Sequence, residues 1–194
     1  MPRVKTEAKS QAILDAASRI FLSREFHEVL IDDIAASAGT GKGTIYRYFS
    51  SKEELFFVSV LHGLDDLHAV LSRELAKKES PRARLSSIAT QTLQFTWNRR
   101  DLVAQLQRDE RLFARRKAEF EERRQRIVAL VAQAIEEGMR RGELREVNPL
   151  TGAEVFLGML RGLNMWRRPT DTIEQLVAIA LDVFLNGVAR RTDA

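Results

Sequence analysis

Hydrophobic residues recur at steps of three and four along nearly the whole chain, the spacing that gathers them on one face of an α-helix. Glycine or proline punctuates this pattern: Gly39 and Gly142 stand where helices should end, and Pro81 and Pro149 where they should begin. The chain is therefore expected to be all-α. The pattern predicts about nine helices, over residues 6–23, 32–37, 42–49, 52–76, 81–98, 101–108, 112–141, 149–166 and 172–190.

The predicted helices change in length along the chain. Those before residue 51 include two very short ones, whereas those after it are mostly long. The chain length allows either one large domain or a small domain followed by a larger one. We expect the second arrangement, with a small domain over 1–51 and a larger one over 52–194. The helix predicted over 52–76 is long enough to connect them.

Residues 31–55 read IDDIAASAGTGKGTIYRYFSSKEEL and hold the most informative local pattern. A short helix ending at Gly39, a glycine turn and a second short helix from Lys42 form the arrangement of a helix-turn-helix, which presents its second helix to the major groove of DNA. That second helix is too short to fold alone, so the two helices before it must hold it.

Composition agrees with a soluble globular protein, with 44% hydrophobic and 30% charged residues among 194 and a net charge of +4. The charge is mild, but between Thr40 and Lys52 every charged residue is basic. The absence of cysteine excludes disulfides and thiolate metal sites and favours the cytoplasm. No signal peptide and no run of 18 apolar residues is visible, so we expect no membrane segment.

Five motifs in this region resemble the TetR family of transcriptional regulators, across roughly residues 10–56. They are DIA at 33–35, AG at 38–39, KGTIY at 42–46, YF at 48–49 and SKEEL at 51–55. The remainder resembles the family only in the number, lengths and breaks of its helices.

The resemblance implies a three-helix DNA-binding domain, an all-α ligand-binding and dimerisation domain, and a homodimer. We therefore expect a repressor that binds a palindromic operator in double-stranded DNA as a dimer and is released by a small effector. The apolar bias of the candidate pocket residues favours a hydrophobic or amphipathic one. The alternative is a TetR-like helical interaction protein without specific DNA binding.

The chain departs from the family pattern at two places. Leu30 replaces the threonine that commonly caps the second helix, so that helix is either poorly capped or starts later, with Asp32 as its cap. Thr40 and Gly41 replace the common Val-Ser before the third helix, and Gly41 is expected to be an acceptable but weaker cap. A lost cap costs about 1 kcal/mol, too little to unfold the domain.

DNA contacts are expected on the helix that starts at Lys42 and just beyond it. Glycine allows close backbone approach, hydroxyl and ammonium groups suit phosphates, and arginine suits phosphate or guanine. Phe49 is assigned to the core; Tyr48 is placed on the DNA side, with core packing as its alternative. Arg3, Lys5 and Lys9 form either a basic arm or a solvated tail. The candidate contacts are Lys42, Gly43, Thr44, Tyr46, Arg47, Tyr48 and Lys52.

The last two predicted helices carry more apolar residues than one helix pair needs, which favours a four-helix bundle with a second copy over a core within one chain. Gly158 and Gly162 would let helices approach closely, and a dimer would separate the two recognition helices by about 34 Å, one DNA turn. The candidate dimer contacts are Phe156, Leu160, Leu163, Leu176, Ile179, Val183 and Phe184.

An effector pocket is expected among the long helices, where aromatic, methionine and amide side chains are either its lining or ordinary core. The charged run 99–126 is read as a solvated helix face, or alternatively as a site for an anionic ligand such as an acyl-CoA. The candidate effector contacts are Phe95, Trp97, Asn98, Phe113, Met159 and Asn164.

An enzyme is not expected. His27, His62 and His68 make no metal-ligand spacing, and neither a nucleophile motif nor a phosphate-binding loop is present. We therefore predict no catalytic residues, no metal and no cofactor.

Overall fold

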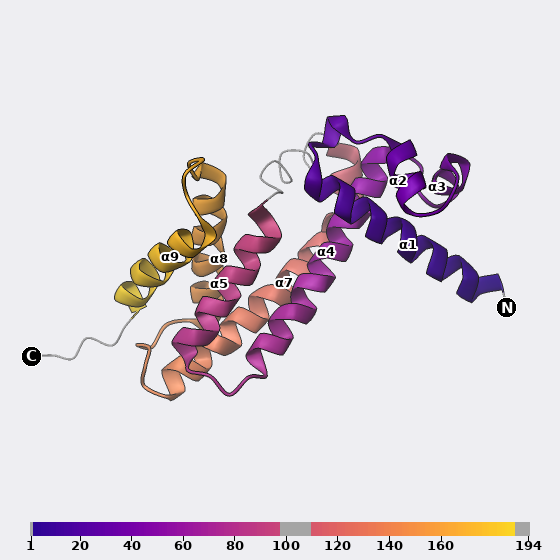
Figure 1. Cartoon of the computed structure of the whole chain (residues 1–194). Coiled ribbons are helices and arrows are strands. Elements are labelled where there is room, and N and C mark those ends of the chain that lie inside the picture. Colours follow the sequence, from indigo (N-terminus) through magenta and orange to yellow (C-terminus); the bar gives the residue numbers. More distant parts are fainter. Residues whose placement is uncertain (1, 98–109, 189–194) are drawn as a thin grey trace, which may run out of the picture. The chain divides into compact units, whose positions relative to one another are not determined.

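The computed structural model describes residues 2–97 and 110–188, and every regular element in these ranges is helical (Figure 1). The all-α prediction is confirmed, while the helix predicted over 101–108 lies outside the described residues. The elements are α1 (Pro2–Ser23), the short 3₁₀ helix η1 (Phe26–Glu28), α2 (Ile31–Ser37), α3 (Lys42–Tyr48), α4 (Lys52–Leu75), α5 (Pro81–Trp97), α7 (Glu110–Arg140), α8 (Pro149–Trp166) and α9 (Ile173–Val188).

Helix ends follow the local chemistry of the sequence. Gly39 and Gly142 adopt positive φ angles of 59° and 73°, the left-handed conformation that ends a helix and that glycine tolerates best. Pro81 and Pro149 open α5 and α8 as predicted. Asn148 also caps α8, because its side chain accepts a hydrogen bond from the Thr151 amide at 3.0 Å.

The two weak caps expected from the sequence are confirmed. Leu30 and Gly41 stand at the N-caps of α2 and α3 in extended conformations, and neither makes a side-chain capping bond. The later start of α2, with Asp32 as its cap, is wrong, since α2 begins at Ile31. The segment predicted to be a basic arm or a tail is helical instead, because α1 already begins at Pro2.

The chain divides into two compact units at a different place from the predicted boundary. The first comprises the described residues 2–65 and 110–120, and the second comprises 66–97 and 121–188. The boundary therefore falls inside α4, not at its start. The reason is that Leu55 and Phe57, early in α4, are completely or almost completely buried in the core that α1, α2 and α3 share.

The core of the first unit is built from the inner faces of α1 to α4. Ile13 of α1, Ile34 of α2 and Ile45 of α3 are almost wholly inaccessible to solvent. The Phe21 and Phe56 rings meet edge to face with centroids 5.0 Å apart, a favoured aromatic geometry. One continuous apolar cluster thus fixes the three N-terminal helices, the indigo to purple part of Figure 1, to the beginning of α4.

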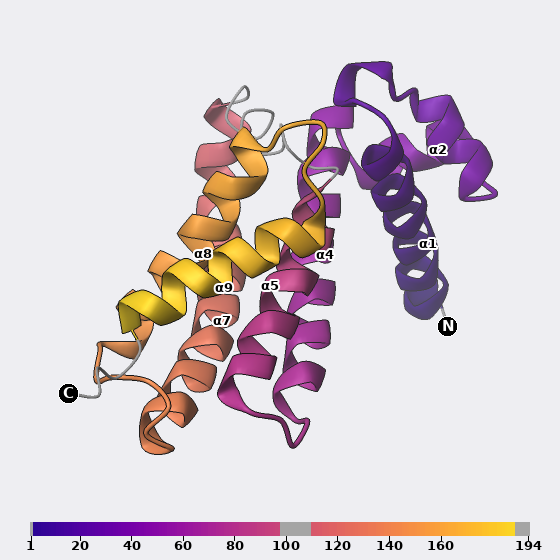
Figure 2. The same ribbon diagram turned by 60° about the vertical axis from the view of Figure 1, so that its left-hand side comes forward.

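In the second unit, α9 crosses over α5 and α8, and these three helices contact one another (Figure 2). The Phe156 and Phe184 rings lie 4.8 Å apart between α8 and α9. This packing corrects part of the predicted dimer surface: the core of a single chain buries four of the candidates, so their side chains have no surface left for a partner. These four are Phe156, Leu160, Leu176 and Phe184.

Among the described residues, α4 is the one helix whose length and composition would allow it to cross a membrane. Half of its most apolar stretch, 50%, is already buried within the chain. A helix that buries its apolar side chains against its own protein shows the pattern of a core helix.

The packing around Gly138 of α7 makes a prediction about stability. A Cβ atom at this position would lie 2.6 Å from Leu144 Cδ1 and 3.2 Å from Pro81 Cβ. Alanine is favoured over glycine in helices by about 1 kcal/mol, but overpacking a filled core costs about 1–3 kcal/mol. We therefore expect Gly138→Ala to lower the free energy of unfolding by about 1 kcal/mol and the melting temperature by roughly 2–4 °C.

Leu144→Ala provides the control, because it removes the atoms with which the new methyl group overlaps. In that background Gly138→Ala should raise the melting temperature, since the helix preference then outweighs the remaining close contact with Pro81 Cβ at 3.2 Å. Thermal unfolding followed by circular dichroism measures both. The same sign of effect in the two backgrounds would contradict this account of the packing.

Candidate DNA interface

Helix α3 presents one narrow apolar edge to the protein and the rest of its surface to solvent. Ile45 is its buried residue, 1% exposed, and Phe49, which follows the helix, is also buried, as predicted. Lys42, Gly43 and Arg47 are exposed. Tyr46 is 46% exposed, and Thr44 is half-buried. The structure thus brings five of the predicted DNA contacts together on one polar, basic helix.

Tyr48 lies differently from its assignment to the DNA side. Its side chain is half-buried and packs against the core of the first unit, with its ring 6.4 Å from that of Phe49. Position 48 is three residues after Ile45 and so falls close to the buried edge of the helix. Most of the Tyr48 side chain therefore packs in the core, which is the alternative prediction for this residue.

Lys42 is exposed but engaged. Its Nζ donates a hydrogen bond of 3.0 Å to Asp32 Oδ2 on α2, and this bond is the main reason that the pKa of Lys42 lies above its ordinary value. The lysine remains positively charged at neutral pH, and a DNA phosphate would compete with Asp32 for it. The sequence did not reveal this pair, since residues ten apart in different helices have no fixed spacing.

Lys52, the first residue of α4, lies over an aromatic ring. Its ammonium is 4.4 Å from the centroid of Phe26 in η1, a cation–π contact. Partial burial lowers its pKa below the ordinary value. This contact holds the Lys52 charge close to the turn that follows α3. The sequence did not indicate Phe26, because only tertiary structure brings the two residues together.

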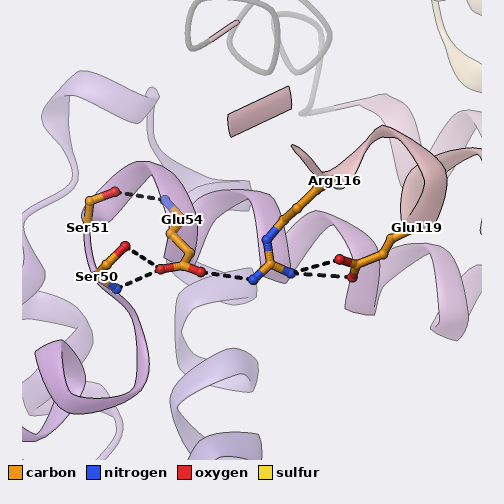
Figure 3. A network of polar contacts seen from close by, with 5 residues as sticks. All are labelled: Ser50, Ser51, Glu54, Arg116 and Glu119. Carbon is orange, nitrogen blue, oxygen red and sulfur yellow. Dashed lines mark hydrogen bonds and ion pairs between the residues drawn. The ribbon is translucent and has the colours of Figure 1, made fainter. Parts of the chain in front are cut away.

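The turn between α3 and α4 is held by a network of polar contacts (Figure 3). Ser51 Oγ caps α4 by accepting a hydrogen bond of 3.1 Å from the Glu54 amide. Glu54 in turn accepts hydrogen bonds from the Ser50 amide, at 2.7 Å, and from the Ser50 hydroxyl. These bonds, the hydroxyl foremost, lower the pKa of Glu54, so its carboxylate is charged at neutral pH.

Arg116 of α7 extends this network. It donates to Glu54 Oε1 at 2.9 Å and to the Glu119 carboxylate at 3.3 Å, as Figure 3 shows. Arg124 binds both oxygens of Glu154 on α8 at 2.7 and 3.0 Å. The charged run 99–126 is predicted to be a solvated helix face or a site for an anionic ligand. These two arginines fit neither prediction, because each pairs with a carboxylate on another helix.

The predicted effector residues are not gathered in one place. Phe113 belongs to the first unit, where its ring lies 6.4 Å from Phe57, so it is corrected to core packing. Phe95, Trp97 and Met159 are half-buried in the second unit, and Asn98 lies outside the described residues.

Asn164 is buried, and both ends of its amide are occupied within the chain. It donates to the Thr96 carbonyl at 2.9 Å and accepts from Arg167 Nε at 3.2 Å. Arg167 also stacks on the Trp97 ring, 4.0 Å from its centroid. A surface pocket of about 610 Å³ between α5 and α9 contains none of the predicted effector residues.

An apolar surface remains on α8 and α9 after the core residues are removed from the predicted dimer contacts. Ile179 and Val183 are 50% and 58% exposed, and Leu163 is half-buried. Val155 of α8, which the sequence did not single out, is also exposed. A Cβ atom at Gly158 or Gly162 would meet nothing within 4 Å, so nothing in the part of the chain that the structure describes restricts either position to glycine.

Comparison with known proteins gives matches over most of the chain. Residues 13–58 match a family model described as bacterial regulatory proteins, tetR family, and residues 78–188 match one described as Tetracyclin repressor-like, C-terminal domain. The uncharacterized HTH-type transcriptional regulator YfiR of Bacillus subtilis is 30% identical over 84% of this chain and 82% of its own length. The HTH-type transcriptional repressor BepR of Brucella suis is 29% identical over 86% and 85%.

Solved structures agree at the level of the fold. The transcriptional regulator FadR from Bacillus subtilis, in complex with stearoyl-CoA, superposes with a TM-score of 0.72 over 91% of this chain and 98% of its own, at 17% identity. The two family models and the similarity to YfiR extend this likeness to the sequence. The chain belongs to the TetR family of helix-turn-helix transcriptional regulators.

Proposed function

We propose that this regulator is a repressor that binds a palindromic operator as a homodimer and leaves it when a small hydrophobic or amphipathic molecule binds the second unit. The observation that carries the proposal is the exposed, basic surface of α3, held in place by the buried Ile45. We assign its action to the cytoplasm, as a regulator and not an enzyme. The similarity to BepR, a transcriptional repressor, supports the sign of regulation.

On this surface we assign phosphate contacts to Lys42, Thr44, Tyr46 and Lys52, and base contacts to Arg47. Gly43 is the position where the backbone comes nearest the DNA. A Cβ atom there would meet nothing within 4 Å in the free protein, although glycine inside a helix costs about 1 kcal/mol relative to alanine. The described residues of the free chain give no steric reason for this glycine, whereas an approaching DNA backbone or base edge would.

The dimer would form through α8 and α9. Ile179 and Val183 are one turn apart on α9 and expose apolar side chains together, and Gly158 and Gly162 are one turn apart on α8. Small residues let helices pack closely, and exposed apolar side chains gain free energy when a second copy covers them. A twofold dimer also matches the palindromic symmetry of the operator.

Release by an effector requires a route from the second unit to α3. We assign this route to α4, whose residues 52–65 belong to the first unit and 66–75 to the second. The effector site is proposed near Phe95, Trp97 and Met159, which are apolar and half-buried. The stearoyl-CoA bound by FadR supports an amphipathic effector with a long apolar part.

The proposed DNA contacts are tested by Gly43→Ala. Because the new methyl group has free space in the protein but would meet DNA, the variant should be as stable as the wild type or slightly more so. Its affinity for a duplex that the wild type selects from a random-sequence library should fall at least tenfold. Fluorescence anisotropy across a range of salt concentrations should give an unchanged salt dependence, since no charge is lost.

Lys52→Ala is the matched comparison. It should weaken binding to the selected duplex and to random duplex alike, and reduce the slope of log affinity against log salt by about one. If the wild type shows no salt-dependent binding to any duplex, the chain is an interaction protein without DNA binding. If Gly43→Ala binds like the wild type, the orientation assigned to α3 is wrong.

The dimer surface is tested by the double variant Ile179→Asp, Val183→Asp. Two buried, unpaired carboxylates oppose association strongly, and both positions are exposed in the single chain, so its folding is spared. Light scattering should give twice the chain mass of 22.1 kDa for the wild type and the single mass for the variant. Gln94→Asp, at an exposed position of α5, should stay dimeric; a dimeric double variant would place the interface elsewhere.

The effector class is tested by thermal unfolding with stearate, stearoyl-CoA and an apolar aromatic compound. A ligand present at a hundred times its dissociation constant stabilises the folded state by about 2.7 kcal/mol. For a chain of this length that shift corresponds to roughly 5–11 °C. The stabilising compound should also weaken binding to the selected duplex; if none of the three raises the melting temperature, the proposed class is wrong.

A further inference from the structure

We infer that Arg116 of α7 is a positioning residue for DNA binding, which acts by holding the Glu54 carboxylate that fixes the end of the recognition helix α3. The inference rests on the proposed DNA-binding function and adds a control of α3 by α7. Arg116 itself touches no DNA in this account. Its effect passes through the serine turn, and Figure 3 shows the contacts that carry it.

The connection between α3 and α4 is short enough to transmit a displacement. Phe49 is the C-cap of α3, its amide bound to the Ile45 carbonyl at 3.0 Å, and α4 starts at Lys52. Only Ser50 and Ser51 lie between them, and both bond to Glu54. A shift of the Glu54 carboxylate therefore changes the position of the Ser50 amide, next to the last turn of α3.

Arg116 is well placed to set the position of that carboxylate. It binds the Glu54 oxygen Oε1, whereas the Ser50 groups bind Oε2, so the two interactions do not compete. Glu119, one turn further along α7, holds the other guanidinium nitrogen. The planar guanidinium thus links α7 to Glu54 in one defined orientation, which a flexible ammonium does not provide.

Burial distinguishes this pair from the Lys42–Asp32 pair of the same unit. The side chains of Arg116 and Glu54 are 27% and 21% exposed, compared with 51% and 64% for Lys42 and Asp32. Partly buried charges are screened less by salt and water than exposed ones. Their side chains also lose less conformational entropy when they are held in one geometry. The Arg116–Glu54 pair is therefore the better candidate for a contact that defines position.

The same helix is anchored in the second unit. Arg124 grips Glu154 of α8 through two hydrogen bonds, and α7 continues without a break between residues 116 and 124. A change in the second unit that moves α7 would therefore reach Arg116 along a continuous helix. Arg116 gives α7 a route to the recognition helix beside the one assigned to α4.

The test compares Arg116→Ala with Arg115→Ala, an exposed neighbour on the same helix whose loss removes the same charge. The probes are the duplex selected by the wild type and a random duplex. We expect Arg116→Ala to weaken binding to the selected duplex roughly 5- to 10-fold, at the low end for coupling between separate sites. Binding to random duplex and the salt slope should match those of Arg115→Ala, because every proposed phosphate contact is retained.

A double-mutant cycle with Glu54→Gln identifies the path. This substitution keeps an oxygen acceptor for Ser50 but removes the charge that Arg116 binds. If Arg116 acts through Glu54, adding Arg116→Ala to the Glu54→Gln variant should change the affinity for the selected duplex less than twofold. Arg116→Lys, which keeps a positive charge, should retain part of the affinity that Arg116→Ala loses. If Arg116→Ala does not fold, the double-mutant cycle is made with Arg116→Lys and Glu54→Gln instead.

The outcomes separate this inference from the function on which it rests. Equal affinities of Arg116→Ala and Arg115→Ala for the selected duplex would overturn it, as would independent effects of the Arg116 and Glu54 substitutions. Equal weakening on both duplexes would also overturn it, because that result marks a general loss of structure or charge. A wild type that binds no duplex overturns the proposed function, and this inference falls with it.

Discussion

The proposed DNA-facing surface depends on the burial of one side chain from a helix that cannot persist alone. Helix α3 has seven residues, too few for a stable helix in water, and neither a side-chain cap nor an acidic first turn supports its start. Ile45 supplies what local structure lacks, because its side chain is lodged in the core with Ile34 and Leu55. With this edge fixed, the remaining positions of α3 need no packing role and are free to carry polar groups.

The charges around α3 are held by partners within the protein before any DNA arrives. Lys42 is bound to Asp32, and Lys52 lies on Phe26. Such contacts restrict the side chains, which would reduce the entropy lost in the proposed phosphate contacts. They would also oppose binding where the partner is an anion, since Asp32 would have to release Lys42. Phe26 carries no such opposing charge, so the two lysines are expected to contribute differently to affinity.

The sequence predicted those features that neighbouring residues determine. Helix ends at Gly39, Gly142 and Pro149 follow from backbone preferences of the residues themselves, and the motif around Lys42 located the candidate interface. The sequence did not predict what covers the apolar face of each helix. A helical repeat cannot distinguish a face buried in its own chain, as at Phe156, from one left exposed, as at Val183. The Arg116 and Glu54 pair joins residues 62 apart, and no local pattern reports such a contact.

An ion pair suits a contact through which one helix influences another. A coupling contact must orient the helix, yet break when a ligand favours another state by the few kcal/mol that differential binding supplies. A large apolar contact would resist that change, since burying a single leucine is worth about 1.5–3 kcal/mol. A partly exposed pair such as Arg116 and Glu54 contributes about 1 kcal/mol or less to stability, but its hydrogen bonds are directional. It can therefore define the position of the turn after α3 without locking the protein in one state.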